Sequence, residues 1–193
     1  ASTILIGQAM GSRDETMVKR TMGTALGSII PISIVVSTGG WIFAPMLLDL
    51  LGTPASAVDL ALTYLRMIFA AMPITLTFTL IMMALRGTGD STTPLWFIII
   101  SVVIDLILTP TLILGLGPFP EWGIFGSAFA TAAANTLALI GMVITMYMRG
   151  SVLTLSMPEL RFLRADRDIL KSMFSKGLPM GLQMIVISSA ALT

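Results

Sequence analysis

A single acidic residue, Asp105, lies near the middle of a long apolar segment of this 193-residue chain. Helical spacing places Ser101 and Thr109 on the same face as Asp105, because residues four apart lie one above the other along a helix. Pro110 has no N–H, so the carbonyl group of Leu106 loses its usual hydrogen-bond donor beside Asp105. A carboxylate, two hydroxyl groups and a free carbonyl oxygen suit a hard cation such as sodium, or they can hold a proton.

A second polar stripe lies on the next apolar segment and consists of Ser127, Thr131 and Asn135. Counting from the basic ends of the two segments puts Asn135 at the depth of Asp105 and Thr131 at the depth of Thr109. We therefore expect the two stripes to face each other across a pair of neighbouring helices.

Two threonines of the preceding segment, Thr75 and Thr79, can extend this polar pocket, although threonines in membrane helices often bond only to their own backbone. A charged Asp at the centre of a bilayer costs roughly 2.5–3.5 kcal/mol on insertion scales, so it is normally given partners or a proton, and a functional role is the default. The alternative is a protonated Asp105 that serves packing alone. The candidate residues for ion coupling or a substrate cavity are Asp105, Thr109, Ser101, Thr131, Asn135 and Thr79, with sodium as a candidate ion at Asp105 and no resident metal.

The segments that carry these residues are long enough to cross a membrane. A hydrocarbon core of roughly 30 Å needs about 20 helical residues, and helices satisfy their own backbone hydrogen bonds in lipid. The chain is 55% hydrophobic and only 11% charged. We therefore predict an all-α integral membrane protein, a polytopic transmembrane helix bundle, with spans at residues 21–48, 62–85, 94–115 and 122–148.

The basic residues predict the orientation of these spans. Ten of the eleven Lys and Arg residues fall in three stretches that alternate with loops holding acids but no bases. The positive-inside rule makes the three basic stretches cytoplasmic and places the loops around residues 49–59 and 115–121 outside. Arg66 is the exception, and we expect it to extend with Tyr64 toward the outer interface.

Several functional classes are disfavoured by composition. The chain has no Cys and no His, which removes thiolate zinc sites and Ser/His or Cys/His catalytic arrangements. We find no paired intramembrane acids either, so the protein is not expected to be an enzyme and is not expected to need a cofactor. Nucleic acid is not an expected partner, whereas membrane lipid is.

The chain divides into three predicted regions. Residues 1–148 hold the transmembrane helices, residues 149–176 form a cytoplasmic loop with an amphipathic helix over 166–176, and residues 177–193 begin a further helix. The chain starts without Met and stops inside an apolar run. We expect it to be a fragment that holds the tail of one helix, four whole spans and the start of another.

A succession of short motifs resembles the MATE (multidrug and toxic compound extrusion) transporters. In order along the chain they are GQAMGSRD, YLRM, LRGTGDSTTP, DLILTPTLILG, GIFGSAFAT and KGLPMGLQ. In that family twelve helices form two six-helix lobes. The resemblance implies that this chain is a partial N-terminal lobe, from the end of the second helix through the inter-lobe loop into the seventh.

The same resemblance implies a secondary active antiporter in the plasma membrane, in bacteria the inner membrane. It would export small organic compounds, often cationic, in exchange for sodium ions or protons by alternating access, without ATP and with the C-terminal lobe as partner. The family's fifth helix commonly reads Asn, then Asp four residues later, then Pro. Here those positions hold Asp105, Thr109 and Pro110, so the carboxylate has moved by one turn. Thr131 falls in the sixth-helix region that contributes to the polar cluster of the N-terminal lobe in some members.

Two other functions stay open at this point. Related families with similar lobes act as flippases for lipid-linked oligosaccharide precursors, and such a site should be a large basic groove. Apart from Arg66, the chain offers no basic residue within its spans. A membrane scaffold without cargo is the other alternative, and Asp105 at the midplane argues against it.

Overall fold

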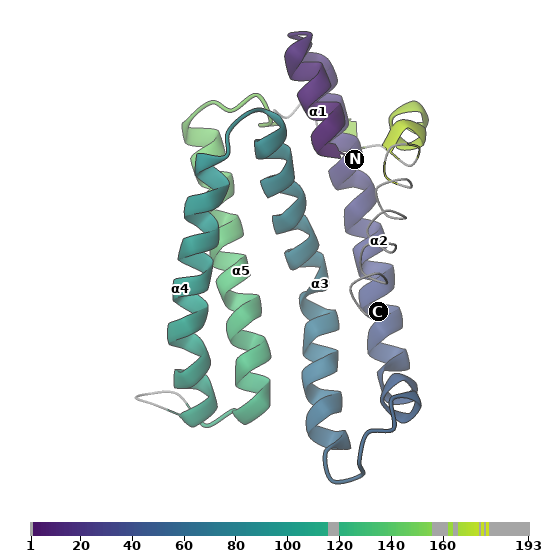
Figure 1. Cartoon of the computed structure of the whole chain (residues 1–193), viewed down its shortest axis with the longest axis vertical. Coiled ribbons are helices and arrows are strands. Elements are labelled where there is room, and N and C mark those ends of the chain that lie inside the picture. Colours follow the sequence, from purple (N-terminus) through teal and green to yellow (C-terminus); the bar gives the residue numbers. More distant parts are fainter. Residues whose placement is uncertain are drawn as a thin grey trace, which may run out of the picture. The chain divides into compact units, whose positions relative to one another are not determined.

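The computed structural model describes residues 2–115, 120–155, 162–163, 166–173, 175 and 177. Within these residues the regular structure is helical (Figure 1). The helices are α1 (Ser2–Gly11), α2 (Glu15–Leu50), α3 (Val58–Gly87), α4 (Thr92–Leu114) and α5 (Gly123–Met148). Residues 167–173 are also α-helical. The predicted start of another helix at 177–193 lies, after Gly177, outside the described residues.

Four of these helices, α2 to α5, are long and apolar enough to cross a membrane. They contain or closely match the predicted spans, which confirms the predicted all-α membrane fold. Helix α2 is the longest, and its 36 residues measure about 54 Å, well beyond the hydrocarbon thickness. It continues through Pro31 and Pro45 without ending. Many of its large apolar side chains are exposed, as suits a surface in lipid.

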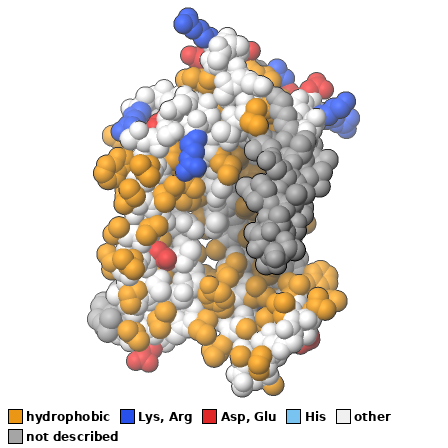
Figure 2. Space-filling view, viewed as in Figure 1, with side chains coloured by type: hydrophobic (Ala, Val, Ile, Leu, Met, Phe, Trp, Pro, Cys, Tyr) orange, Lys and Arg blue, Asp and Glu red, His pale blue; other side chains and the backbone are white. Residues whose placement is uncertain are grey.

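The chain divides into two compact units, and the helices α2 and α3 each contribute to both. Unit 1 comprises residues 1–28, 80–91 and 149–193, and unit 2 comprises residues 29–79 and 92–148. Every Lys and Arg except Arg66 falls within the ranges of unit 1. Figure 2 shows Lys and Arg side chains on the surface, and many hydrophobic side chains that are also exposed.

Unit 1 is held together by close helix contacts and one ion pair. Asp14 caps α2 by accepting a hydrogen bond from the Met17 amide at 2.9 Å. Gly87 at the end of α3 leaves room for α1, because a Cβ there would lie 2.9 Å from the Thr3 carbonyl oxygen. Arg20 of α2 forms a salt bridge with Asp166. This pair ties the segment that holds residues 167–173 to α2.

Helices α4 and α5 of unit 2 pack against each other and lie side by side in Figure 1. A Cβ at Gly126 would lie 2.8 Å from the Leu112 carbonyl oxygen, and a Cβ at Gly141 would lie 2.8 Å from the Phe97 ring. Small residues of this kind let helix backbones approach closely in lipid, as the sequence of α5 predicts. The buried alanines of the same helix are Ala128, Ala130, Ala132, Ala134 and Ala138.

Candidate functional site

The predicted carboxylate, Asp105, joins α4 to α5. The Thr131 hydroxyl of α5 donates to Asp105 Oδ1 at 3.0 Å, and the Thr109 hydroxyl of α4 donates to the same oxygen at 3.2 Å. Thr131 Oγ1 also lies 3.3 Å from the Ser127 carbonyl oxygen. One hydroxyl proton serves one acceptor at a time, and the contact with the carboxylate is the shorter and the one that a charge would strengthen.

A second contact between the stripes lies one turn away. Ser101 of α4, which is buried, donates from its hydroxyl to Asn135 Oδ1 of α5 at 3.0 Å. The two polar stripes therefore face each other, and Ser101, Asp105, Thr109, Thr131 and Asn135 form one polar cluster.

The predicted register of the stripes is wrong by one helical turn. We expected Asn135 opposite Asp105 and Thr131 opposite Thr109, whereas Asn135 pairs with Ser101 and Thr131 with Asp105. Counting from the segment ends assumes that both helices begin at the same depth. The actual register is set by packing, because Gly126 and Gly141 allow close approach only where they meet the facing α4 surface.

The threonines of α3 do not join the cluster by hydrogen bonds. Thr79 donates to the Thr75 carbonyl oxygen at 2.9 Å, and Thr75 donates to the Ala71 carbonyl oxygen at 3.2 Å. These are the backbone contacts that membrane threonines often make. A role for Thr79 in the substrate cavity stays a prediction.

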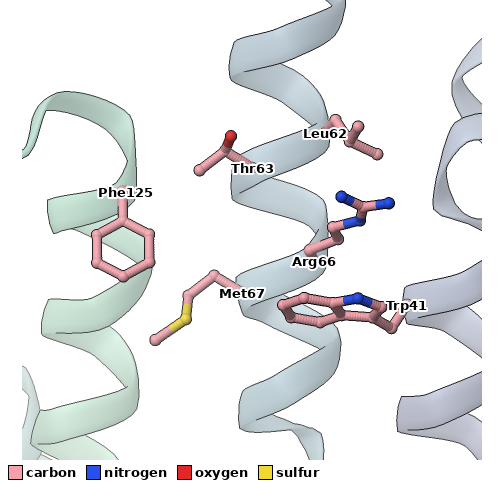
Figure 3. A pocket seen from close by; sticks show the side chains of 6 residues that line it. All are labelled: Trp41, Leu62, Thr63, Arg66, Met67 and Phe125. Atoms are coloured by element: carbon pink, nitrogen blue, oxygen red, sulfur yellow. The ribbon is translucent and has the colours of Figure 1, made fainter.

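A cavity of about 240 Å³ in unit 2 was not predicted from the sequence (Figure 3). Its lining residues are Trp41 of α2, Leu62, Thr63, Arg66 and Met67 of α3, and Phe125 of α5. The guanidinium carbon of Arg66 lies 5.5 Å from the centroid of the Trp41 ring. Arg66 Nε is buried and has no hydrogen-bond partner among the described residues.

The head group of Arg66 stacks on an indole ring, and its Nε is buried. The expected extension of this side chain toward the outer interface stays a prediction. An Arg inside a predicted span was the only sequence signal of this cavity. Trp41 and Phe125 come from other helices, so sequence spacing could not have assigned them to the same place.

The donor set limits the chemistry of the polar cluster. The described residues contain no group of three or more acids, Cys or His residues that could hold a metal ion. One carboxylate with two hydroxyls can bind a proton, or it can supply part of the oxygen shell of a monovalent cation.

Comparisons with known proteins found a matching family model and relatives similar in sequence. The family model MatE matches residues 1–111. The chain is 36% identical over 187 residues to the probable multidrug resistance protein YoeA of Bacillus subtilis, covering 97% of this chain and 40% of that protein. It is 31% identical over 189 residues to the probable multidrug resistance protein YpnP of the same organism, again covering 97% and 40%.

A solved structure has the same fold. It is the outward-facing conformation of a multidrug resistance MATE family transporter of the MOP superfamily, with a TM-score of 0.84 and 21% sequence identity. The match covers 99% of this chain and 41% of that one. The chain thus spans about 40% of the length of the curated relatives and of the solved transporter that it matches.

Proposed function

The chain belongs to the MatE family, and on that premise we propose that the whole protein is a secondary active antiporter that exports small organic compounds, often cationic, in exchange for sodium ions or protons. The names of the Bacillus relatives support multidrug export. As the family implies, the chain is part of a membrane transporter and not of an enzyme.

The observation that carries this proposal is the hydrogen bonding of Asp105 across two membrane helices. Two hydroxyls, one from each helix, donate to one oxygen of this carboxylate. A proton on Asp105 weakens its ability to accept these bonds, and a sodium ion attracts the hydroxyl oxygens as ligands instead of their protons. Either ion changes how α4 is bonded to α5. Ion binding can therefore favour one conformation of the transporter over another.

The proposed mechanism needs no resident cofactor and no ATP. The coupling ion enters the polar cluster, the organic substrate occupies the cavity between the two lobes, and the lobes alternate access to the two sides. The protein is multi-pass, and we place it in a bacterial inner membrane with the basic ends of its helices in the cytoplasm. Lipid and the C-terminal lobe are the partners of its apolar helix faces.

The flippase alternative finds little support in this part of the chain. A diphosphate-linked sugar lipid requires several cationic groups within the transport path. Arg66 is the one basic residue in the sequence ranges of unit 2. The cavity beside it holds about 240 Å³, too small for an oligosaccharide precursor.

The test is export of a fluorescent cationic dye from proteoliposomes that hold the full-length protein, under separately imposed sodium and proton gradients. We expect one gradient to drive export and Asp105→Asn to lower the driven rate at least tenfold, because the variant can neither bind a proton nor carry a negative charge. Asp49→Asn, which removes an exposed carboxylate at the end of α2, is the control and should retain the rate. Export that survives Asp105→Asn would move the coupling site elsewhere, and export that neither gradient drives would overturn the antiport proposal.

A further inference from the structure

The cavity at Arg66 contains an arginine without a hydrogen-bonded partner. Arg66 Nε is buried and unbonded among the described residues, and those residues provide no ion pair for the guanidinium. A buried N–H without an acceptor is costly, so a ligand acceptor that reaches Nε would remove that cost. The face of the guanidinium is already covered by Trp41. Its N–H edge is therefore the part that is free to donate.

The walls of the cavity favour a flat ring. In Figure 3 the Arg66 head group lies over the Trp41 ring, while Met67 and Thr63 point from α3 toward the α5 side, where Phe125 projects. Aromatic rings and a methionine sulfur form favourable contacts with an aromatic ligand. The cavity volume of about 240 Å³ limits this ligand to one or two fused rings with a small substituent.

The polar lining fixes the sign of that substituent. The Thr63 hydroxyl already donates its proton to the Asp59 carbonyl oxygen at 2.9 Å, so it offers an anion no donor, and the sign depends on Arg66. Arg66 supplies N–H donors and no acceptor. A carboxylate matches the planar fork of an arginine in both charge and geometry.

From these contacts we propose that the Arg66 cavity is a binding site for small aromatic carboxylates, separate from the Asp105 cluster. Phe125 precedes Thr131 by six residues on α5, which is about 9 Å along the helix axis toward its first residue. The two sites therefore lie at different depths. The Asp105 cluster offers a carboxylate, and the Arg66 cavity offers a cation.

A lipid phosphate could also bind the Arg66 head group, but it would not need the aromatic walls. Trp41 and Phe125 come from two different helices and both line the cavity. A phosphate on a flexible glycerol would leave these rings uncovered. An aromatic carboxylate would contact both the Arg66 head group and the aromatic walls, whereas a lipid headgroup would contact Arg66 alone.

The test is calorimetric titration of the full-length protein in phosphatidylcholine nanodiscs with 2-naphthoate. The comparison ligands are 2-naphthamide and 2-naphthylmethylammonium, which keep the ring and change the charge. We expect 2-naphthoate to bind at least tenfold more tightly than either, and Arg66→Gln to remove that advantage, since a charge-assisted pair is worth about 10- to 100-fold in affinity. Arg86→Gln, at the far end of the same helix, is the matched control and should bind 2-naphthoate as the wild type does.

A second variant keeps the test decisive if Arg66→Gln does not fold. Leu62→Trp places a large side chain in the cavity and should abolish 2-naphthoate binding while Arg66 remains. Equal binding by wild type and Leu62→Trp, or equal affinity for the anionic and cationic ligands, would overturn the proposal.

A separate set of titrations tests whether a lipid headgroup occupies the Arg66 cavity instead. Titrations at high salt, which screens the surface charge, are repeated in nanodiscs that contain phosphatidylglycerol. Unchanged affinity supports the proposal, and loss of 2-naphthoate binding to the anionic lipid overturns it. The assay uses no ion gradient, and Asp105→Asn should bind 2-naphthoate normally. Failure of the antiport proposal would therefore not affect it.

Discussion

At the residue scale, the most consequential side chain is a carboxylate that two helices share. Asp105 accepts hydroxyl protons from Thr109 of its own helix and from Thr131 of the neighbouring helix, both at Oδ1. The contact with Thr131 is the one that links the elements. The contribution of this contact to the stability of the α4–α5 pair can be measured separately from that of threonines that bond only to their own backbone.

Thr131→Val should weaken the α4–α5 pair, because it removes the hydroxyl and keeps the shape of the side chain. Hydrogen bonds between membrane helices contribute about 0.6 kcal/mol on average and up to about 1.7 kcal/mol. We expect a double-mutant cycle with Asp105→Leu, which removes the acceptor oxygen, to give a coupling energy in that range, measured from reversible unfolding of the full-length protein. Thr136→Val is the control, since the Thr136 hydroxyl donates to the Ala132 carbonyl oxygen of its own helix at 2.7 Å. A coupling energy near zero for Thr131 would mean that the contact has no energetic role.

At the element scale, glycines decide how closely helices approach. A Cβ at Gly126 would lie 2.8 Å from a backbone oxygen of Leu112, which cannot rotate away. A Cβ at Gly39 of α2 would meet nothing within 4 Å. The same substitution should therefore have opposite effects at the two positions.

Gly126→Ala should destabilise the protein by about 1–3 kcal/mol, the usual cost of overpacking, because it forces α5 away from α4. Gly39→Ala should be neutral or stabilising by up to about 1 kcal/mol, because alanine loses less backbone entropy in a helix. Thermal unfolding of both variants in the same detergent measures the difference. Equal stability of the two variants would contradict the close approach of α4 and α5.

The ion pair between Arg20 and Asp166 gives the loop segment a pH dependence. The hydrogen bond from Arg20 and the one from the Asp168 amide hold the pKa of Asp166 below its ordinary value of 3.8. Because the pKa of this carboxyl is lower in the folded state than in the unfolded state, the ion pair stabilises the folded segment at any pH above the unfolded-state pKa. This stabilisation is lost as the pH falls through the folded-state pKa. At neutral pH the Asp166 carboxylate is therefore ionised and can pair with Arg20.

Asp166→Asn should increase amide hydrogen exchange of residues 167–173 at neutral pH. The difference from the wild type should shrink as the pH falls from about 3.8 toward the lower pKa of folded Asp166, where the carboxylate becomes protonated. Hydrogen exchange with mass spectrometry of the full-length protein, compared at matched pH, measures this. Asp168→Asn is the control, because Asp168 contributes its backbone amide to the contact and its side chain is exposed. A difference that persists unchanged into strong acid would exclude the ion pair as its cause.

At the scale of the whole molecule, the segregation of charge predicts which helix ends face the cytoplasm. The ranges of unit 1 hold every basic residue except Arg66, and the connection between α2 and α3 holds no base. Translocating basic segments is disfavoured, so this connection should lie outside.

Single cysteines can test this orientation, because the chain has none of its own. Ser56 lies in the exposed connection between α2 and α3, and Ser91 lies exposed between α3 and α4. We expect a membrane-impermeant maleimide to label Ser56→Cys in intact cells and Ser91→Cys only after permeabilisation. The reverse pattern would invert the topology and place the basic stretches outside.

The sequence by itself determined the fold class, the four spans and the residues of the polar cluster. Span length, hydropathy and charge are properties of single segments, and a period of 3.6 residues places Ser101, Asp105 and Thr109 on one face without knowledge of any neighbour.

Only the tertiary structure decided how the segments meet. The pairing of Asp105 with Thr131 rather than with Asn135 follows from the glycine contacts between α4 and α5, which no count along one chain segment contains. The cavity at Arg66 likewise depends on Trp41 and Phe125, which lie far apart in sequence and are brought together by three packed helices. Contacts between helices depend on the shapes of two surfaces at once, and the sequence of one surface does not specify its register on the other.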